Sequence, residues 1–186
     1  MEKETAKDKK IAQLLKDLNK GDDKSIEKAL NGLQKHGDAS VIRPLADFWV
    51  TLSSDAPQHE QFQAFFNDLK HNDTAEVIME LVFEDTYKDI KQFLLISIWN
   101  SKVDYSEYLK DFVKLAVDGD FMQALECLTI IENMEGPFQE HQFLDAQVEL
   151  SVYAESKEKE KDEQKAKIMS ELAIILKEYE RNHIEF

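Results

Sequence analysis

The sequence predicts an all-α fold of about ten antiparallel helices, and three observations support this prediction. The 186 residues contain only five glycines and three prolines, most of which lie between apolar segments. Apolar residues recur three and four positions apart over long stretches, as they do on one face of a helix. No stretch shows the sustained period-two alternation that is typical of half-buried strands. The sequence therefore predicts either a helical repeat array or an irregular helical bundle.

Each expected helix follows from its apolar stripe and from the breaks beside it. Gly21, Gly37, Gly119 and Gly136 lie between stripes, where glycine readily ends a helix. Pro44 lies a few residues into its segment, so that helix is expected to start late or to bend. The expected segments are 11–18, 25–36, 40–52, 58–71, 74–82, 87–99, 105–117, 121–134, 138–153 and 155–181. Residues 1–6 are expected to fray, and the charged stretch 155–165 is expected to form an irregular helix start.

The large apolar side chains are expected to form the core, because their spacing is that of a buried stripe. Segment 87–99 is apolar all round, which suggests a central, buried helix. Segment 138–153 carries the apolar residues Phe143, Leu144, Val148 and Val152. The other expected core residues are Trp49, Phe62, Phe65, Phe66, Trp99 and the single cysteine, Cys127.

The helix pairs recur with a regular period. Their expected starts lie near residues 23, 57, 87 and 120, which are 30 to 34 residues apart. A period in the thirties is the mark of a helical repeat array. We therefore expect one α-helical repeat domain over residues 1–186.

One stretch carries a family resemblance. In residues 24–53, a first helix has Ala29, Leu30 and Leu33, Gly37-Asp38 forms a turn, and a second helix has Val41, Ile42, Pro44 and Leu45. This stretch resembles a HEAT-type repeat, and the rest of the chain follows it by period only. The resemblance implies an α-solenoid of the armadillo/HEAT class, a class dominated by protein-binding scaffolds. Tetratricopeptide arrays rank second, because their Trp, Leu-Gly, Tyr and Pro signature is not visible.

The net charge of −15 is concentrated in the middle of the chain. Residues 54–155 hold 21 acidic and 6 basic side chains, and residues 115–156 hold no Lys or Arg. Binding to nucleic acid requires clustered Lys and Arg. The charge distribution therefore argues against a nucleic-acid partner and favours a basic protein or peptide.

Three pairs of carboxylates, each four residues apart, are the candidate binding residues. Residues at this spacing share a helix face, and like charges there cost the helix about 0.2–0.5 kcal/mol per pair. The HEAT-like resemblance implies that the second helix of each pair lines a concave surface, so the carboxylates would form an acidic groove. The other interpretation is a solvent-exposed face that keeps the protein soluble. The residues are Glu76 and Glu80, Glu107 and Asp111, and Asp145 and Glu149.

The sequence contains no pattern that predicts catalysis, a cofactor or a metal site. No two of the five histidines have a metal-ligand spacing, and no phosphate-binding loop or nucleophile motif is present. No apolar run approaches the ~18–20 residues of a membrane span, and no secretory signal is visible, so a cytoplasmic location is expected. The predicted function is a non-enzymatic protein-binding scaffold. The alternatives are an inhibitory or immunity-type acidic protein that neutralises a basic enzyme, and an enzyme with dispersed catalytic residues.

Overall fold

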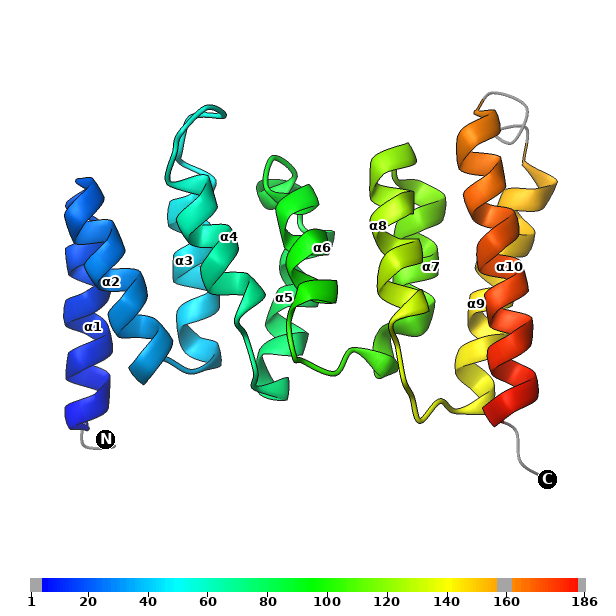
Figure 1. The fold of residues 1–186 in the computed structure, drawn as a ribbon, viewed down its shortest axis with the longest axis horizontal. Helices are drawn as coiled ribbons and strands as arrows, with labels where there is room; N and C mark the ends of the chain where they lie inside the picture. Colours follow the sequence, from blue (N-terminus) through cyan, green and yellow to red (C-terminus); the bar gives the residue numbers. More distant parts are fainter. Residues whose placement is uncertain (1–4, 157–161, 184–186) are drawn as a thin grey trace. The chain divides into compact units, whose positions relative to one another are not determined.

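The chain folds as an all-α protein, as the sequence predicts. The computed structural model describes residues 5–156 and 162–183, which contain ten α-helices and no β-strand. The helices are α1 (Ala6–Leu18), α2 (Asp23–His36), α3 (Ile42–Trp49), α4 (His59–Asn67), α5 (Ala75–Phe83), α6 (Lys91–Asn100), α7 (Leu109–Asp118), α8 (Phe121–Glu132), α9 (Glu140–Glu155) and α10 (Glu163–His183) (Figure 1). The chain divides into two compact units, Met1–Val103 and Asp104–Phe186.

The helices of the first unit form two rows. In one row α2 packs on α4 and α4 packs on α6, whereas in the other α3 packs on α5. Helix α1 packs along α2, and α5 also contacts α6, which joins the rows (Figure 1). Consecutive helices are joined by short connections, as is typical of antiparallel neighbours.

The helix boundaries differ from the expected ones where a short 3₁₀ helix precedes the α-helix. Residues Ala39–Val41 form such a helix, so α3 begins only at Ile42 and Pro44 lies in its first turn, the late start that Pro44 predicts. Residues Asp85–Tyr87 form another, and α6 begins at Lys91 rather than at residue 87. Of the two stretches expected to be irregular, residues 1–4 and 157–161 lie outside the described residues.

Trp49 is the centre of the core in the first unit. Its side chain is fully buried, and its ring lies 5.4 Å from that of Phe62, 5.1 Å from that of Phe66 and 5.6 Å from that of Phe93. These partners come from α4 and α6, so one residue of α3 packs against both helices. The indole N–H donates to Nδ1 of His59 over 2.7 Å, which satisfies the only polar group of the buried ring. Trp49, Phe62, Phe65 and Phe66 therefore lie in the core, as predicted.

In the second unit, α7 packs on both α8 and α9, and α10 packs on the same two helices. The core lies between these four helices. It is formed by Leu109, Phe112, Val113, Cys127, Ile130, Ile131, Phe143, Ala146, Leu172 and Leu176. Cys127 is fully buried, as its apolar helix predicts.

A buried lysine fixes the start of α10 to the end of α7. The Nζ atom of Lys165 donates to the carbonyl oxygens of Val117 and Gly119, at 2.6 Å each. It also lies 5.6 Å from the ring centre of Tyr153. A cation suits this place, because the last carbonyls of a helix lack partners within the helix and carry partial negative charge.

Candidate functional site

The predicted carboxylates fall in both units. Glu76 and Glu80 lie on α5 of the first unit, whereas Glu107, Asp111, Asp145 and Glu149 belong to the second. Glu107 lies in the 3₁₀ helix Ser106–Tyr108 that precedes α7, and all six positions except Asp111 and Glu149 are exposed.

In the first unit, the acidic pair on α5 is partly neutralised. Arg43 of α3 places Nη2 2.7 Å from Glu80 and 2.8 Å from Glu84. The same guanidinium donates to the hydroxyl of Tyr87 over 3.3 Å, and that hydroxyl donates to Asp47 over 2.7 Å. Burial raises the pKa of Tyr87, and the hydrogen bond to Asp47 raises it further. This network connects α3 to α5, so Glu80 has a structural partner within the unit.

In the second unit, α7 presents charged side chains along one face. Glu107, Asp111, Lys114 and Asp118 are spaced four, three and four residues apart, which places them on one side of the helix. Lys114 Nζ lies 2.8 Å from Asp118 Oδ2, and this hydrogen bond raises the pKa of Lys114. The face thus holds three carboxylates and one ammonium group.

Helix α9 adds two carboxylates, Asp145 and Glu149, which lie four residues apart on one side of that helix. Burial raises the pKa of Asp111, and the charge of Glu149 also raises it, whereas Lys110 lowers it. The charge of Glu149 also acts on Lys114. The structure therefore brings together Asp111 and Glu149, which are 38 positions apart in the sequence. We call the set of Glu107, Asp111, Asp118, Asp145 and Glu149 the α7–α9 acidic face.

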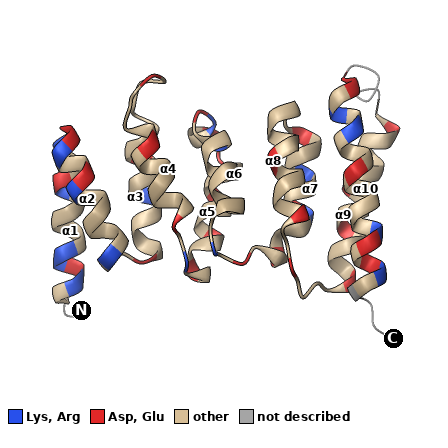
Figure 2. Cartoon of the chain, in the orientation of Figure 1, with Lys and Arg blue, Asp and Glu red and all other residues tan. Residues whose placement is uncertain are grey.

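The charge balance around this face is strongly negative. Residues 104–156 carry 12 acidic and 2 basic side chains, and α8 and α9 contain neither Lys nor Arg (Figure 2). Asp145 is exposed on α9 and Glu107 is exposed beside α7. This excess of carboxylates over Lys and Arg creates a negative electrostatic potential, which attracts basic groups.

One expectation about α9 is wrong. Phe143 is buried as predicted, but Leu144, Val148 and Val152 are 51%, 60% and 58% exposed. The buried side of α9 is formed instead by Gln142, Phe143, Ala146 and Tyr153. Because 144, 148 and 152 are each four apart, they form a separate apolar stripe on the outer side of the helix. Trp99, which was expected in the core, is also exposed, at 39%.

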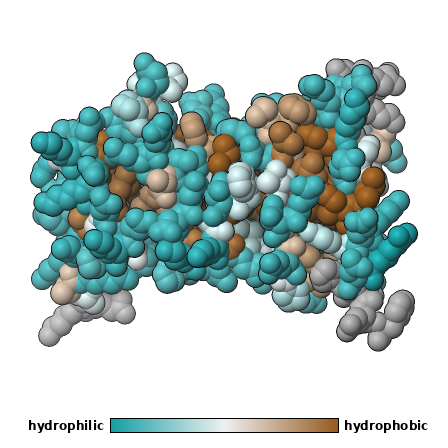
Figure 3. Space-filling view, viewed as in Figure 1, coloured by the Kyte–Doolittle hydropathy of each residue, from teal (hydrophilic) through white to brown (hydrophobic). Residues whose placement is uncertain are grey.

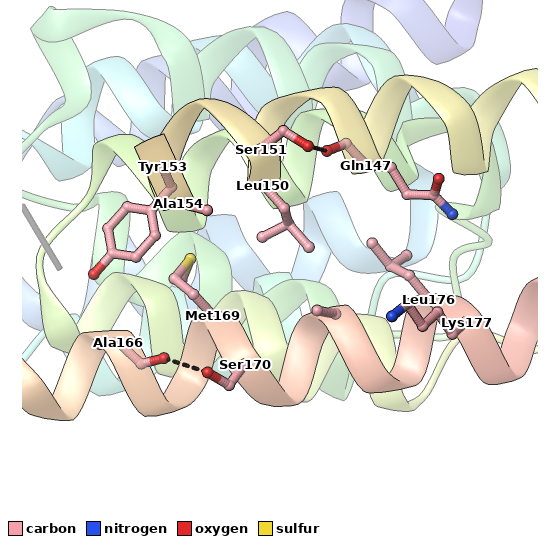
Figure 4. Close-up of a pocket in the computed structure, with 11 residues that line it drawn as sticks. Gln147, Leu150, Ser151, Tyr153, Ala154, Ala166, Met169, Ser170, Leu176 and Lys177 are labelled. Carbon is pink, nitrogen blue, oxygen red and sulfur yellow. Dashed lines mark hydrogen bonds between the residues drawn. The ribbon is translucent and has the colours of Figure 1, made fainter. Parts of the chain in front are cut away.

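A pocket lies beside this stripe, between α9 and α10. It has a volume of about 450 Å³ and is lined mainly by apolar or small side chains, among them Leu150, Met169, Ala173 and Leu176. Figure 4 shows Leu150 and Met169 directed into the space between the two helices. This pocket could not be predicted from the sequence, because its lining residues have the same helical spacing as a core.

Neither the described residues nor comparison with known proteins points to a metal site, a membrane span or a known family. Within residues 5–156 and 162–183, no three His, Cys, Asp or Glu side chains gather as ligands for a metal ion. None of the described helices has both the length and the hydropathy needed to cross a bilayer. No family model matches the chain, and no curated protein or solved structure matches it significantly.

Proposed function

We propose that the chain is a protein-binding scaffold of the α-solenoid class, with HEAT-like helix pairs, and that it binds a basic protein or peptide. The two rows of helices in the first unit support the solenoid class. The packing of α7 on α9 and of α8 on α10 in the second unit supports it as well. In such arrays neighbouring pairs stack through nearest-neighbour contacts and present an extended surface to a partner.

The observation that carries the proposed partner is the α7–α9 acidic face. Asp111 and Glu149 come from two helices and lie close enough for the charge of one to raise the pKa of the other. This repulsion is relieved when a cation binds between them. A basic partner therefore gains electrostatic attraction that an acidic or neutral partner lacks.

The proposal is tested with a labelled, Lys-rich 20-residue peptide and the full chain. We expect the triple variant Glu107→Lys, Asp145→Lys, Glu149→Lys to bind the peptide at least tenfold more weakly, as measured by fluorescence anisotropy. The affinity of the unaltered chain is expected to fall as NaCl rises from 50 to 300 mM, because exposed charges are screened.

The matched control makes the same change of net charge in the first unit. It is the variant Asp55→Lys, Asp85→Lys, Asp89→Lys, at three exposed positions. If this control weakens binding as much as the first variant, attraction by total charge explains the binding and the proposed site is wrong. Circular dichroism checks that both variants keep the helicity of the unaltered chain.

A further inference from the structure

The outer side of α9 carries an apolar stripe, and a pocket lies on the side of the same helix that faces α10. The pocket is lined on α9 by residues from Gln147 to Ala154 and on α10 by residues from Ala166 to Lys177. With 1.5 Å of rise per residue, it follows α10 for about 16 Å, or three helical turns. At 100° per residue, Leu144 lies between the pocket side of α9 and the stripe that continues to Val148 and Val152. Figure 3 shows apolar surface over α8 and α10 of this unit as well.

The two serine hydroxyls in the pocket are already satisfied by their own helices. The hydroxyl of Ser151 donates to the carbonyl oxygen of Gln147 over 2.8 Å, and that of Ser170 donates to Ala166 over 2.9 Å (Figure 4). Neither serine therefore needs a hydrogen bond from a bound molecule. The stripe, with the pocket beyond it, thus offers a partner mainly apolar contact, as does a surface that holds an amphipathic helix.

The charges beside this surface favour a basic partner. Helix α9 carries Glu140, Asp145, Glu149 and Glu155 and no cation. Asp145 and Glu149 each follow a stripe residue directly, so they lie on the flank of the stripe. Lys177 is the single charged side chain among the described residues that line the pocket, and it lies on α10. A partner's cations are therefore favoured along α9 and disfavoured next to Lys177.

From these observations, and resting on the proposed function, we infer the form of the partner. The geometry points to an amphipathic helix of another protein, which packs its apolar face on the stripe of Leu144, Val148 and Val152. Its Lys or Arg side chains align with Asp145 and Glu149, on the flank of the stripe that is turned away from the pocket. The stripe from Leu144 to Val152 is about 12 Å long, so about two turns of such a helix cover it.

The test uses the full chain and a labelled 18-residue peptide with Leu on one helical face, Lys on its flank and Ala elsewhere. The control peptide has the same composition in shuffled order, so that Leu and Lys no longer form faces. We expect the shuffled peptide to bind at least tenfold more weakly. We expect the same loss for Val148→Ser, Val152→Ser, whereas Phe83→Ser, an exposed apolar position in the first unit, is expected to leave the affinity unchanged.

A second variant, Asp145→Asn, Glu149→Gln, separates this inference from the proposed function. If the charge variant binds weakly but the Val148→Ser, Val152→Ser variant binds like the unaltered chain, the helix-binding surface is wrong and the acidic site stands. If neither variant changes the affinity, both proposals are wrong. Light scattering tests a second copy as the occupant: a dimer that dissociates in the valine variant would overturn the inference. We expect both the unaltered chain and the valine variant to be monomers.

Discussion

The first and the last helix pairs of the described chain have cavities of similar size and opposite chemistry. The cavity between α1 and α2 has a volume of about 430 Å³ and is bordered by Lys10, Lys24, Lys28 and Lys35. The pocket between α9 and α10 has about 450 Å³ and is lined by Leu150, Met169 and other apolar residues. A helix pair with a polar outer side is stable in water without a neighbour, whereas an apolar outer side gains stability from one. By this argument the last pair, rather than the first, carries the surface on which we propose that a partner binds.

Exposure of large apolar side chains supports the same distinction. Among the described residues, no large apolar side chain of α1 or α2 is exposed. On α9 and α10 four such side chains are exposed: Leu144, Val148, Val152 and Ile174. In the first pair Gly32 lets α1 approach α2 closely, because a Cβ atom on Gly32 would lie 2.5 Å from Leu14 Cδ2. The two pairs therefore differ in the chemistry of their outer sides rather than in the size of their cavities.

The largest expected effect tests whether α9 has one buried and one exposed side. Phe143→Ala removes a ring that is 1% exposed and lies 5.4 Å from the ring of Phe138. We expect a loss of about 3–5 kcal/mol in the free energy of unfolding. Val148→Ala, on the opposite side of the same helix, is expected to cost about 0.5 kcal/mol or less. Urea unfolding followed by circular dichroism measures both.

The losses measured for Phe143→Ala and Val148→Ala show together whether the outer side of α9 is exposed. If Val148→Ala cost more than about 1.5 kcal/mol, a loss typical of buried positions, the outer side of α9 would be covered within the protein itself. The apolar surface would then not be available to a partner, and the difference between the two helix pairs would disappear.

An intermediate effect is expected for the lysine that holds α10. Lys165→Met keeps the apolar stem but removes the two hydrogen bonds to Val117 and Gly119. Hydrogen bonds to charged groups contribute about 1.5–3 kcal/mol, so we expect a loss in this range in the free energy of unfolding. The control is Lys167→Met, whose side chain is 74% exposed and forms an ion pair with Glu163 of the same helix. Equal stability of the two variants would mean that Lys165 does not anchor α10.

The positions of the helices were predictable because periodicity and breaks are local properties. The stripe through Phe62, Phe65 and Phe66 predicts a core helix, and the structure buries all three side chains. The outer stripe of α9 was not predictable, because Leu144, Val148 and Val152 have the same spacing as a core stripe. Only the packing of the neighbouring helices decides which of two apolar stripes is buried.

The candidate site was predictable only in part, for the same reason. Spacing places Glu107 and Asp111 on one face, but it cannot show that Glu149 approaches Asp111 from another helix. It also cannot show that Arg43, 37 positions before Glu80, neutralises one of the expected carboxylates. Lys165 lies in a strongly charged stretch, where nothing in the sequence distinguishes a buried lysine from an exposed one.

The smallest expected effect is the stability that the chain loses because carboxylates lie close together in the α7–α9 acidic face. Burial and the charge of Glu149 raise the pKa of Asp111 in the folded chain. A carboxyl whose pKa is higher in the folded than in the unfolded state stabilises the fold at low pH, and this stabilisation is lost as the pH rises through the folded value. We therefore expect Asp111→Asn to be more stable than the unaltered chain at pH 7, by about 0.5 kcal/mol. The gain should vanish below about pH 4, near the ordinary pKa of Asp, as measured by urea unfolding at both pH values.

The variant Glu149→Gln is the informative companion to this measurement. It removes the charge that raises the pKa of Asp111, so it should reproduce part of the gain at pH 7. If both variants instead destabilise the chain at pH 7, the two carboxylates contribute to folding and their proximity needs no partner to explain it. A gain in stability from either neutral residue has the opposite meaning: the carboxylates oppose folding, which is the cost expected of a surface that binds cations rather than one that holds the helices together.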